Sequence, residues 1–314
     1  MSLSQFIHIF ADVCLPIFIS VGLGWMLDRR FRLHLESLIK LNIYLMVPAF
    51  IFTRIMDTEL SGRESLRIVV FTCAMIALMF VCSSIAGRVF RFAKGQKQAI
   101  SLATMFYNSG NYGLPLVTLA FGHQAAAVQI YVLATMNVAT FTVGLFLAQS
   151  HGETPGKHRR ALLSVLRQPT LYAVGAGLLC RSLSLPVQNV TWLWQPLQLL
   201  QAGLIGFALV TLGVQMSQTK PAPFHAPLWS AIGIRLVIAP FLAAMLASAF
   251  AFSPLASASL ILAAGAPTAV NTALLAHEFG GDVSFATSAV YYSTLLSLLT
   301  TTVNLAVLRV WLGV

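Results

Sequence analysis

Apolar residues run through this chain in long stretches that short polar connections separate. A helix needs roughly 20 mostly apolar residues to cross a bilayer. The pattern predicts an all-α integral membrane protein with about ten transmembrane helices. We place them at approximately 6–27, 35–53, 66–90, 98–121, 125–148, 169–185, 195–216, 227–250, 255–277 and 283–312.

The composition supports this assignment. The 314 residues are 58% hydrophobic and 9% charged, whereas soluble domains average about 25% charged residues. The net charge of +10 does not indicate nucleic acid, because the cations lie in short loops between apolar stretches. The four cysteines fall in apolar stretches and are interpreted as core residues. We find no sequence pattern for a metal or a cofactor, and expect neither.

The longest polar connection, at residues 151–168, divides the chain. It predicts a first repeat of five helices at 1–150, a cytoplasmic linker at 151–168 and a second repeat of five helices at 169–314. Because five is odd, the two repeats would enter the membrane from opposite sides, as inverted repeats do.

Basic residues set the expected orientation. Cytoplasmic loops carry an excess of Lys and Arg, and this rule favours both termini outside the cell membrane. The connections that are then cytoplasmic carry Arg29, Arg30, Arg32, Lys40, Arg88, Arg91, Lys94, Lys97, Lys157, Arg159, Arg160, Arg167 and Lys220.

Two breaks interrupt corresponding hydrophobic stretches, one in each half. They are Asn108–Pro115 and Ala264–Asn271. Glycine and proline disfavour helix, and unwound backbone is tolerated in a bilayer only inside protein or beside a cavity. Matching breaks in two halves indicate a substrate site near the midplane of a secondary transporter.

The residues of these breaks could bind an anion. Pro115 cannot donate to the carbonyl of Asn111, and the half-helix after each break presents free N–H groups. If the breaks cross, two positive helix ends and several amides meet without a buried cation. The expected site residues are Asn108, Asn111, Gly113, Pro115, Pro267, Thr268 and Asn271. The competing interpretation is that the breaks are packing kinks.

Other polar residues leave alternatives open. Arg235 lies inside the eighth stretch, so it could bind a substrate carboxylate or extend to the cytoplasmic interface. Asp12 could be a proton or sodium site or could face the outer interface. His277, Glu278, Asp282 and His123 are expected to be solvated loop residues.

Several segments resemble the auxin efflux carrier family of bacterial and plant transporters. They are Asn111-Tyr-Gly-Leu-Pro115, Pro267-Thr-Ala-Val-Asn271 and Leu41-Asn-Ile-Tyr-Leu-Met-Val-Pro48. The resemblance implies that helices four and nine are broken and cross beside the substrate. It also implies a small carboxylate substrate, malonate-like for a bacterial inner-membrane member, and makes a homodimer plausible.

Three functions are weighed. The first is a secondary or facilitative transporter of a small organic anion. The second is a cation–proton antiporter on a related fold, which would need paired carboxylates near the breaks. The third is an intramembrane enzyme, for which the sequence offers no serine–base pattern, aspartate pair or metal-ligand spacing.

Overall fold

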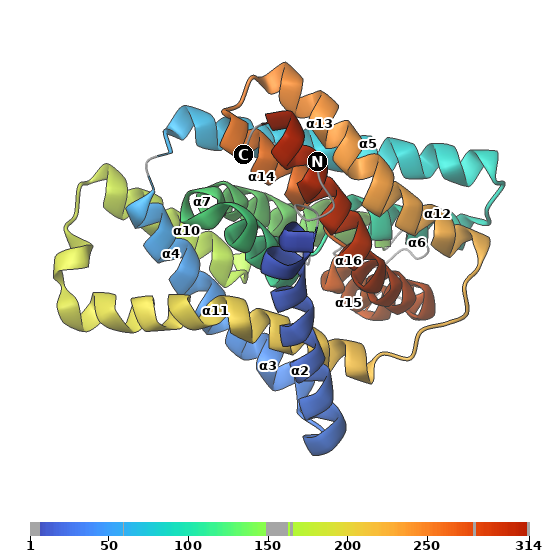
Figure 1. The fold of residues 1–314 in the computed structure, drawn as a ribbon, viewed down its shortest axis with the longest axis horizontal. Helices are drawn as coiled ribbons and strands as arrows, with labels where there is room; N and C mark the ends of the chain where they lie inside the picture. Colours follow the sequence, from blue (N-terminus) through green and yellow to red (C-terminus); the bar gives the residue numbers. More distant parts are fainter. Residues whose placement is uncertain (1–6, 59, 149–162, 164–165, 279–280, 313–314) are drawn as a thin grey trace.

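The computed structural model describes residues 7–58, 60–148, 163, 166–278 and 281–312. The described chain is built of helices, with one isolated antiparallel backbone bridge between Tyr107 and Thr268 (Figure 1). Most of the predicted linker at 151–168 lies outside the described residues.

The first half contains the helices and π-helical turns up to residue 148. In chain order they are η1 (Phe10–Cys14), α2 (Leu15–Phe31), α3 (Leu35–Leu41), η2 (Asn42–Met46), α4 (Val47–Asp57), α5 (Gly62–Val89), α6 (Lys94–Met105), η3 (Ser109–Gly113), α7 (Leu114–Ala139), η4 (Thr140–Gly144) and α8 (Leu145–Ala148).

The second half begins at residue 169. Its elements are α10 (Pro169–Ser182), the 3₁₀ turn η5 (Val187–Asn189), α11 (Thr191–Gln218), α12 (Ala226–Gly233), the π-helical turn η6 (Ile234–Ile238), α13 (Ala239–Phe250), α14 (Pro254–Ala264), α15 (Val270–Glu278) and α16 (Val283–Leu312).

Seven of the described helices are long and apolar enough to cross a membrane. Three features account for the difference from the expected ten. The predicted sixth stretch corresponds to α10, which has only 14 residues. The predicted ninth stretch is divided into α14 and α15, which have 11 and 9 residues. Ser109–Ala148 counts as one stretch, although it contains part of the predicted fourth stretch and all of the fifth. Gly122 separates two helical segments within it, because its φ of 80° and ψ of −168° are not helical and favour glycine. The count of ten remains a prediction.

Prolines explain four π-helical turns of the described chain. A proline cannot donate to the carbonyl four residues earlier, and its ring crowds that carbonyl. The residue before each of these prolines donates instead to the carbonyl five residues before itself, which widens the turn. The turns are η1 before Pro16, η2 before Pro48, η3 before Pro115 and η6 before Pro240.

The helices pack in two groups. The first group is α2, α4, α10 and α11, and the second contains α5, α6, α7, α12, α13, α14, α15 and α16 (Figure 1). Within the first group α2 and α11 meet backbone to backbone, because a Cβ on Gly24 would lie 2.1 Å from the carbonyl oxygen of Val210. Each group thus combines helices from both halves of the chain.

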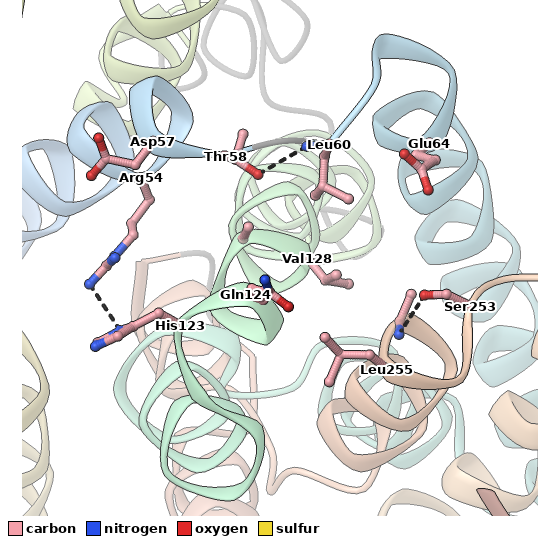
Figure 2. A pocket seen from close by; sticks show the side chains of 12 residues that line it. Arg54, Asp57, Thr58, Leu60, Glu64, His123, Gln124, Val128, Ser253 and Leu255 are labelled. Carbon is pink, nitrogen blue, oxygen red and sulfur yellow. Dashed lines mark hydrogen bonds between the residues drawn. The ribbon is translucent and has the colours of Figure 1, made fainter.

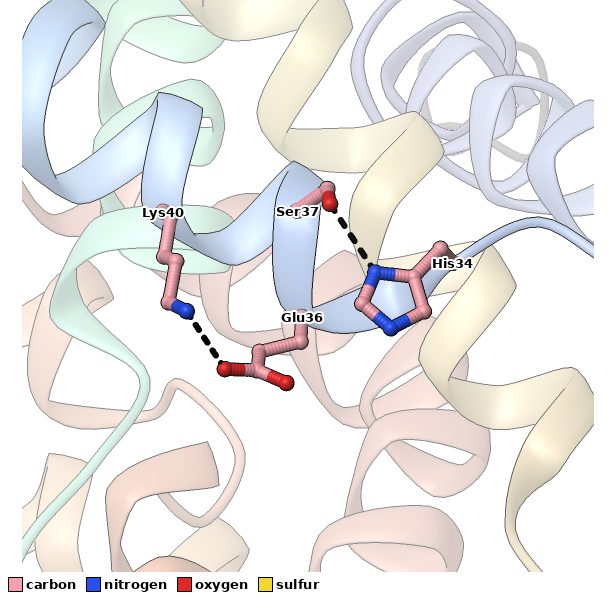
Figure 3. Close-up of polar contacts among 4 residues, drawn as sticks. All are labelled: His34, Glu36, Ser37 and Lys40. Atoms are coloured by element: carbon pink, nitrogen blue, oxygen red, sulfur yellow. Dashed lines mark hydrogen bonds and ion pairs between the residues drawn. The ribbon is translucent and has the colours of Figure 1, made fainter.

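The connection between α2 and α4 carries exposed polar contacts. Lys40 and Glu36 form an ion pair of 2.5 Å, and His34 Nδ1 lies 2.9 Å from Ser37 Oγ (Figure 3). An exposed pair of this kind contributes little to stability. It keeps this turn polar at the end of a membrane helix.

Candidate functional site

The two broken helices cross at their unwound residues. The Asn108 amide donates to the carbonyl of Pro267 at 2.8 Å, and the Ala269 amide donates to the carbonyl of Phe106 at 2.9 Å. These two bonds form the antiparallel bridge between Tyr107 and Thr268. The two unwound segments are antiparallel. The helical segment after the first break, η3 with α7, and the segment after the second break, α15, therefore start at the crossing and leave it in opposite directions.

The unwound residues of the first half begin earlier than the sequence predicts, and residues 109–115 of the predicted break are helical. The unwound residues are Phe106–Asn108, whereas Pro115 already lies in the first turn of α7. In the second half they are Gly265–Ala269, inside the predicted segment. Pro115 is tolerated here because the π-helical turn η3 precedes it, in which the Leu114 amide donates to the carbonyl of Ser109.

Asn108 caps the half-helix that begins at the first break. Its Oδ1 accepts from the Asn111 amide at 3.1 Å, while its buried Nδ2 has no partner in the described chain. Gln129 Nε2 donates to the carbonyl of Ser109 at 2.9 Å and holds the turn against α7. A Cβ on Gly113 would lie 2.9 Å from that Nε2, so only glycine fits without displacing Gln129.

Asn42 joins this site from the other helix group. Its Nδ2 donates to Asn111 Oδ1 at 2.7 Å, and its side chain is 2% exposed. Asn42 Oδ1 has no hydrogen-bond partner among the described residues. Sequence reasoning did not include Asn42 in the site, although an asparagine two turns before Pro48 in an apolar stretch was an available signal.

The residues of the second break differ in their contacts. Pro267 supplies a carbonyl to the bridge. Thr268 is buried, and its Oγ1 donates to the carbonyl of Ala103 at 2.9 Å. Its amide donates to Ser293 Oγ of α16 at 3.0 Å. Asn271 is half-buried in the first turn of α15, and its side chain has no hydrogen bond within the described chain. It therefore keeps its amide group available.

Hydroxyl groups of α16 also hold the first break. Tyr112 is fully buried and accepts from Ser297 Oγ at 3.0 Å, and its hydroxyl lies 3.2 Å from Thr301 Oγ1. Together with Ser293, these residues attach one face of α16 to both breaks. In a chain with few buried charges, such neutral hydrogen bonds fix the unwound backbone.

Arg235 reaches the crossing from the side of the incoming helices. It is 1% exposed, and its Nη1 donates to the carbonyl of Thr104 at 2.7 Å. Its Nη2 donates to the carbonyl of Ala264. These carbonyls lie at the C-terminal ends of α6 and α14, whereas Asn108 and Asn271 lie at the starts of the following half-helices.

A cavity of about 450 Å³ opens between the two helix groups. Arg54 and Asp57 of α4 line one side, and Ser253 and Leu255 at the start of α14 line another (Figure 2). Arg54 Nη2 lies 3.0 Å from His123 Nδ1, directly after the bend at Gly122. This contact connects the first group to the second.

The remaining candidates lie away from the crossing. Asp12 and His277 are exposed, and Asp282 is an exposed residue that accepts from the Phe285 amide at 2.8 Å. The Glu278 side chain is outside the described residues. Among the described acids only Asp28 is buried, and it accepts from the Leu33 amide at 3.0 Å in the connection after α2. The described part of the crossing therefore contains no carboxylate.

Comparison with known proteins places the chain among transporters. A family model described as "Membrane transport protein" matches residues 9–305. A protein of Rhizobium meliloti named "Putative malonate transporter" is 25% identical over 94% of this chain and 94% of its own length. An "Uncharacterized transporter" of Methanothermobacter thermautotrophicus is 25% identical over 91% of this chain and 94% of its own length.

A second archaeal relative gives the same result. The "Uncharacterized transporter MJ1031" of Methanocaldococcus jannaschii is 22% identical over 92% of this chain and 95% of its own length. The matches extend over both halves and include both breaks. The chain is a multi-pass membrane transporter and belongs to the membrane transport protein family, the auxin efflux carrier family.

Proposed function

We propose that this transporter carries a small organic anion, a mono- or dicarboxylate of the malonate type, across the cell membrane by alternating access. The bacterial inner membrane, with both termini outside, is the proposed location. A homodimer is part of the same proposal and rests on the family resemblance alone. The observation that carries the proposal is the crossing of the two unwound segments at Tyr107 and Thr268.

The chemistry of the crossing favours an anion. The half-helices that begin at Ser109 and at Val270 direct their positive ends toward it. Asn108 Nδ2 is a buried donor without a partner in the described chain, and Asn271 lies in the first turn of α15. A carboxylate that accepts from such groups would satisfy donors that are otherwise unpaired. Malonate is the first substrate to test because a relative carries its name.

The proposed transport requires the two helix groups to move relative to each other. Both breaks belong to the second group, and several side-chain hydrogen bonds join that group to the first. The bonds Asn42–Asn111 and Arg54–His123 are two of them. Movement of one group against the other would break and reform these contacts, and this is how a fixed central site alternates between two sides.

A cation–proton antiporter fits the described residues less well. It would need titrating carboxylates at the crossing. The described part of the crossing contains none, and the one buried acid among the described residues, Asp28, lies near the end of α2. The driving force of the proposed transport would be a gradient of the anion itself or of protons.

Uptake into proteoliposomes tests the proposal. We expect labelled malonate to enter vesicles that contain the protein, and unlabelled mono- and dicarboxylates to compete according to their fit, with and without a proton gradient. Asn271→Ala should reduce this uptake, whereas Asn189→Ala, an exposed asparagine outside the crossing, should not. Failure of every carboxylate to enter or compete would refute the function. Equal uptake by both variants would refute the site.

A further inference from the structure

Arg235 is a buried arginine of the second helix group. It lies in the π-helical turn η6 and is the one charged residue of the membrane-spanning stretch Ala226–Phe250. Its side chain is 1% exposed, so it does not extend to an interface. A charged side chain at such depth is rare and functional by default. The acceptors of its hydrogen bonds indicate its role.

Its partners are the carbonyl ends of both incoming half-helices. Arg235 Nη1 donates to the carbonyl of Thr104 at 2.7 Å, and Nη2 donates to the carbonyl of Ala264. Thr104 is in the last turn of α6, and Ala264 is the last residue of α14. The C-terminal end of a helix carries a partial negative charge, and two such ends meet here inside the protein.

Secondary transporters with broken helices place cations at this kind of position. In those proteins, unwound carbonyls and half-helix C-terminal ends coordinate the coupling Na⁺ or H⁺. In this chain the guanidinium of Arg235 already binds the carbonyls of Thr104 and Ala264. The Tyr107 ring lies beside it, with its centroid 5.1 Å from the Arg235 Cζ, and adds a cation–π contact.

We propose that Arg235 is a positioning residue that takes the place of a coupling cation at the crossing. It holds the ends of α6 and α14 together and neutralises them, so that the opposite, N-terminal ends can receive an anion without bound Na⁺. The role in anion binding rests on the proposed function, whereas the role in holding the two helix ends together does not. The crossing therefore needs no sodium in the wild-type protein.

Arg235→Met tests this directly, because methionine keeps most of the apolar volume and removes the charge. Thermal unfolding in detergent is measured in NaCl and in choline chloride at equal concentration, with Arg309→Met, an exposed arginine of α16, as the matched control. We expect Arg235→Met to lower Tm by roughly 5–10 °C in choline chloride. NaCl, or millimolar methylguanidinium, should restore part of that loss. Wild type and Arg309→Met should unfold at the same temperature in both salts.

Two results would overturn the proposal. One is a Tm or a malonate affinity of the wild-type protein that differs between NaCl and choline chloride. The other is an Arg235→Met protein that unfolds like wild type in choline chloride or does not respond to either cation. If Arg235→Met does not fold, Arg235→Gln, which can still donate to one carbonyl, takes its place in the same comparison.

Malonate binding separates positioning from direct substrate contact. If Arg235 acts on the backbone ends, its neutral variants should lose about 10- to 100-fold in affinity for mono- and dicarboxylates alike, with partial recovery in NaCl. A selective loss for dicarboxylates without any response to Na⁺ would overturn the proposal in favour of a substrate contact. The unfolding measurement needs no substrate. Wild type that binds no carboxylate would therefore refute only the proposed function.

Discussion

The hydrogen bond between Asn42 and Asn111 offers the sharpest quantitative test of the site. Asn42 Nδ2 and Asn111 Oδ1 are 2.7 Å apart, across the boundary between the two helix groups. Removing one partner of a buried hydrogen bond costs about 1–3 kcal/mol when the other is left unsatisfied. The structure predicts that the two single substitutions fall at different places in this range.

Asn111→Ala should be the more destabilising change. It leaves the Nδ2 of Asn42 without an acceptor in a side chain that is 2% exposed. We expect about 2–3 kcal/mol for this loss. Asn42→Ala leaves Asn111 Oδ1 without its donor, but Asn111 is half-buried, and the change also removes an Oδ1 that already lacks a partner. We expect about 1 kcal/mol here.

A double-mutant cycle measures the bond itself. Free energies of unfolding for wild type, both single variants and the double variant, from denaturant titration in mixed micelles, should give a coupling of about 1–2 kcal/mol. Additive effects, or an Asn42→Ala loss that exceeds the Asn111→Ala loss, would refute the reasoning.

Asn111→Asp is the control that separates folding from binding. The carboxylate still accepts from Asn42, so the protein should fold. It should lose malonate binding, because a second negative charge then lies beside the expected anion. Normal malonate affinity in this variant would remove Asn111 from the site.

Three further predictions follow from the structure and the sequence. Gly113→Ala should lower the free energy of unfolding by about 1–3 kcal/mol, because its Cβ would displace Gln129, whereas Gly110→Ala, with Leu133 Cδ1 3.4 Å away, should be nearly neutral in the same titration. His123→Ala removes a contact between the helix groups, so we expect a changed maximal rate of malonate uptake with unchanged equilibrium binding. An unchanged rate would show that the contact does not limit movement. A cysteine at Gly156, outside the described residues, should be labelled only after the membrane is permeabilised, and labelling in intact cells would reverse the predicted orientation.

Much of the architecture could be predicted from the sequence because the bilayer restricts the choices. Long apolar stretches must be helical when no water is present to satisfy their backbone groups. Pro16, Pro48, Pro115 and Pro240 likewise act through local sterics, and each follows a widened turn. The two breaks were recognisable because glycine and proline gather in otherwise apolar sequence. The family was recognisable from the residues around these breaks.

The partners across the crossing were decided by tertiary structure alone. Hydropathy gives the length of a helix but not its neighbours, so nothing local shows that Tyr107 pairs with Thr268 or that Asn42 binds Asn111. The same limit explains Arg235. Its sequence position left open an interface or a substrate carboxylate, and only the packing of α6, α14 and η6 shows that its Nη atoms meet the carbonyls of Thr104 and Ala264. The sequence located the second unwound segment and the neighbourhood of the first, and the fold determined which distant groups replace the lost helical bonds.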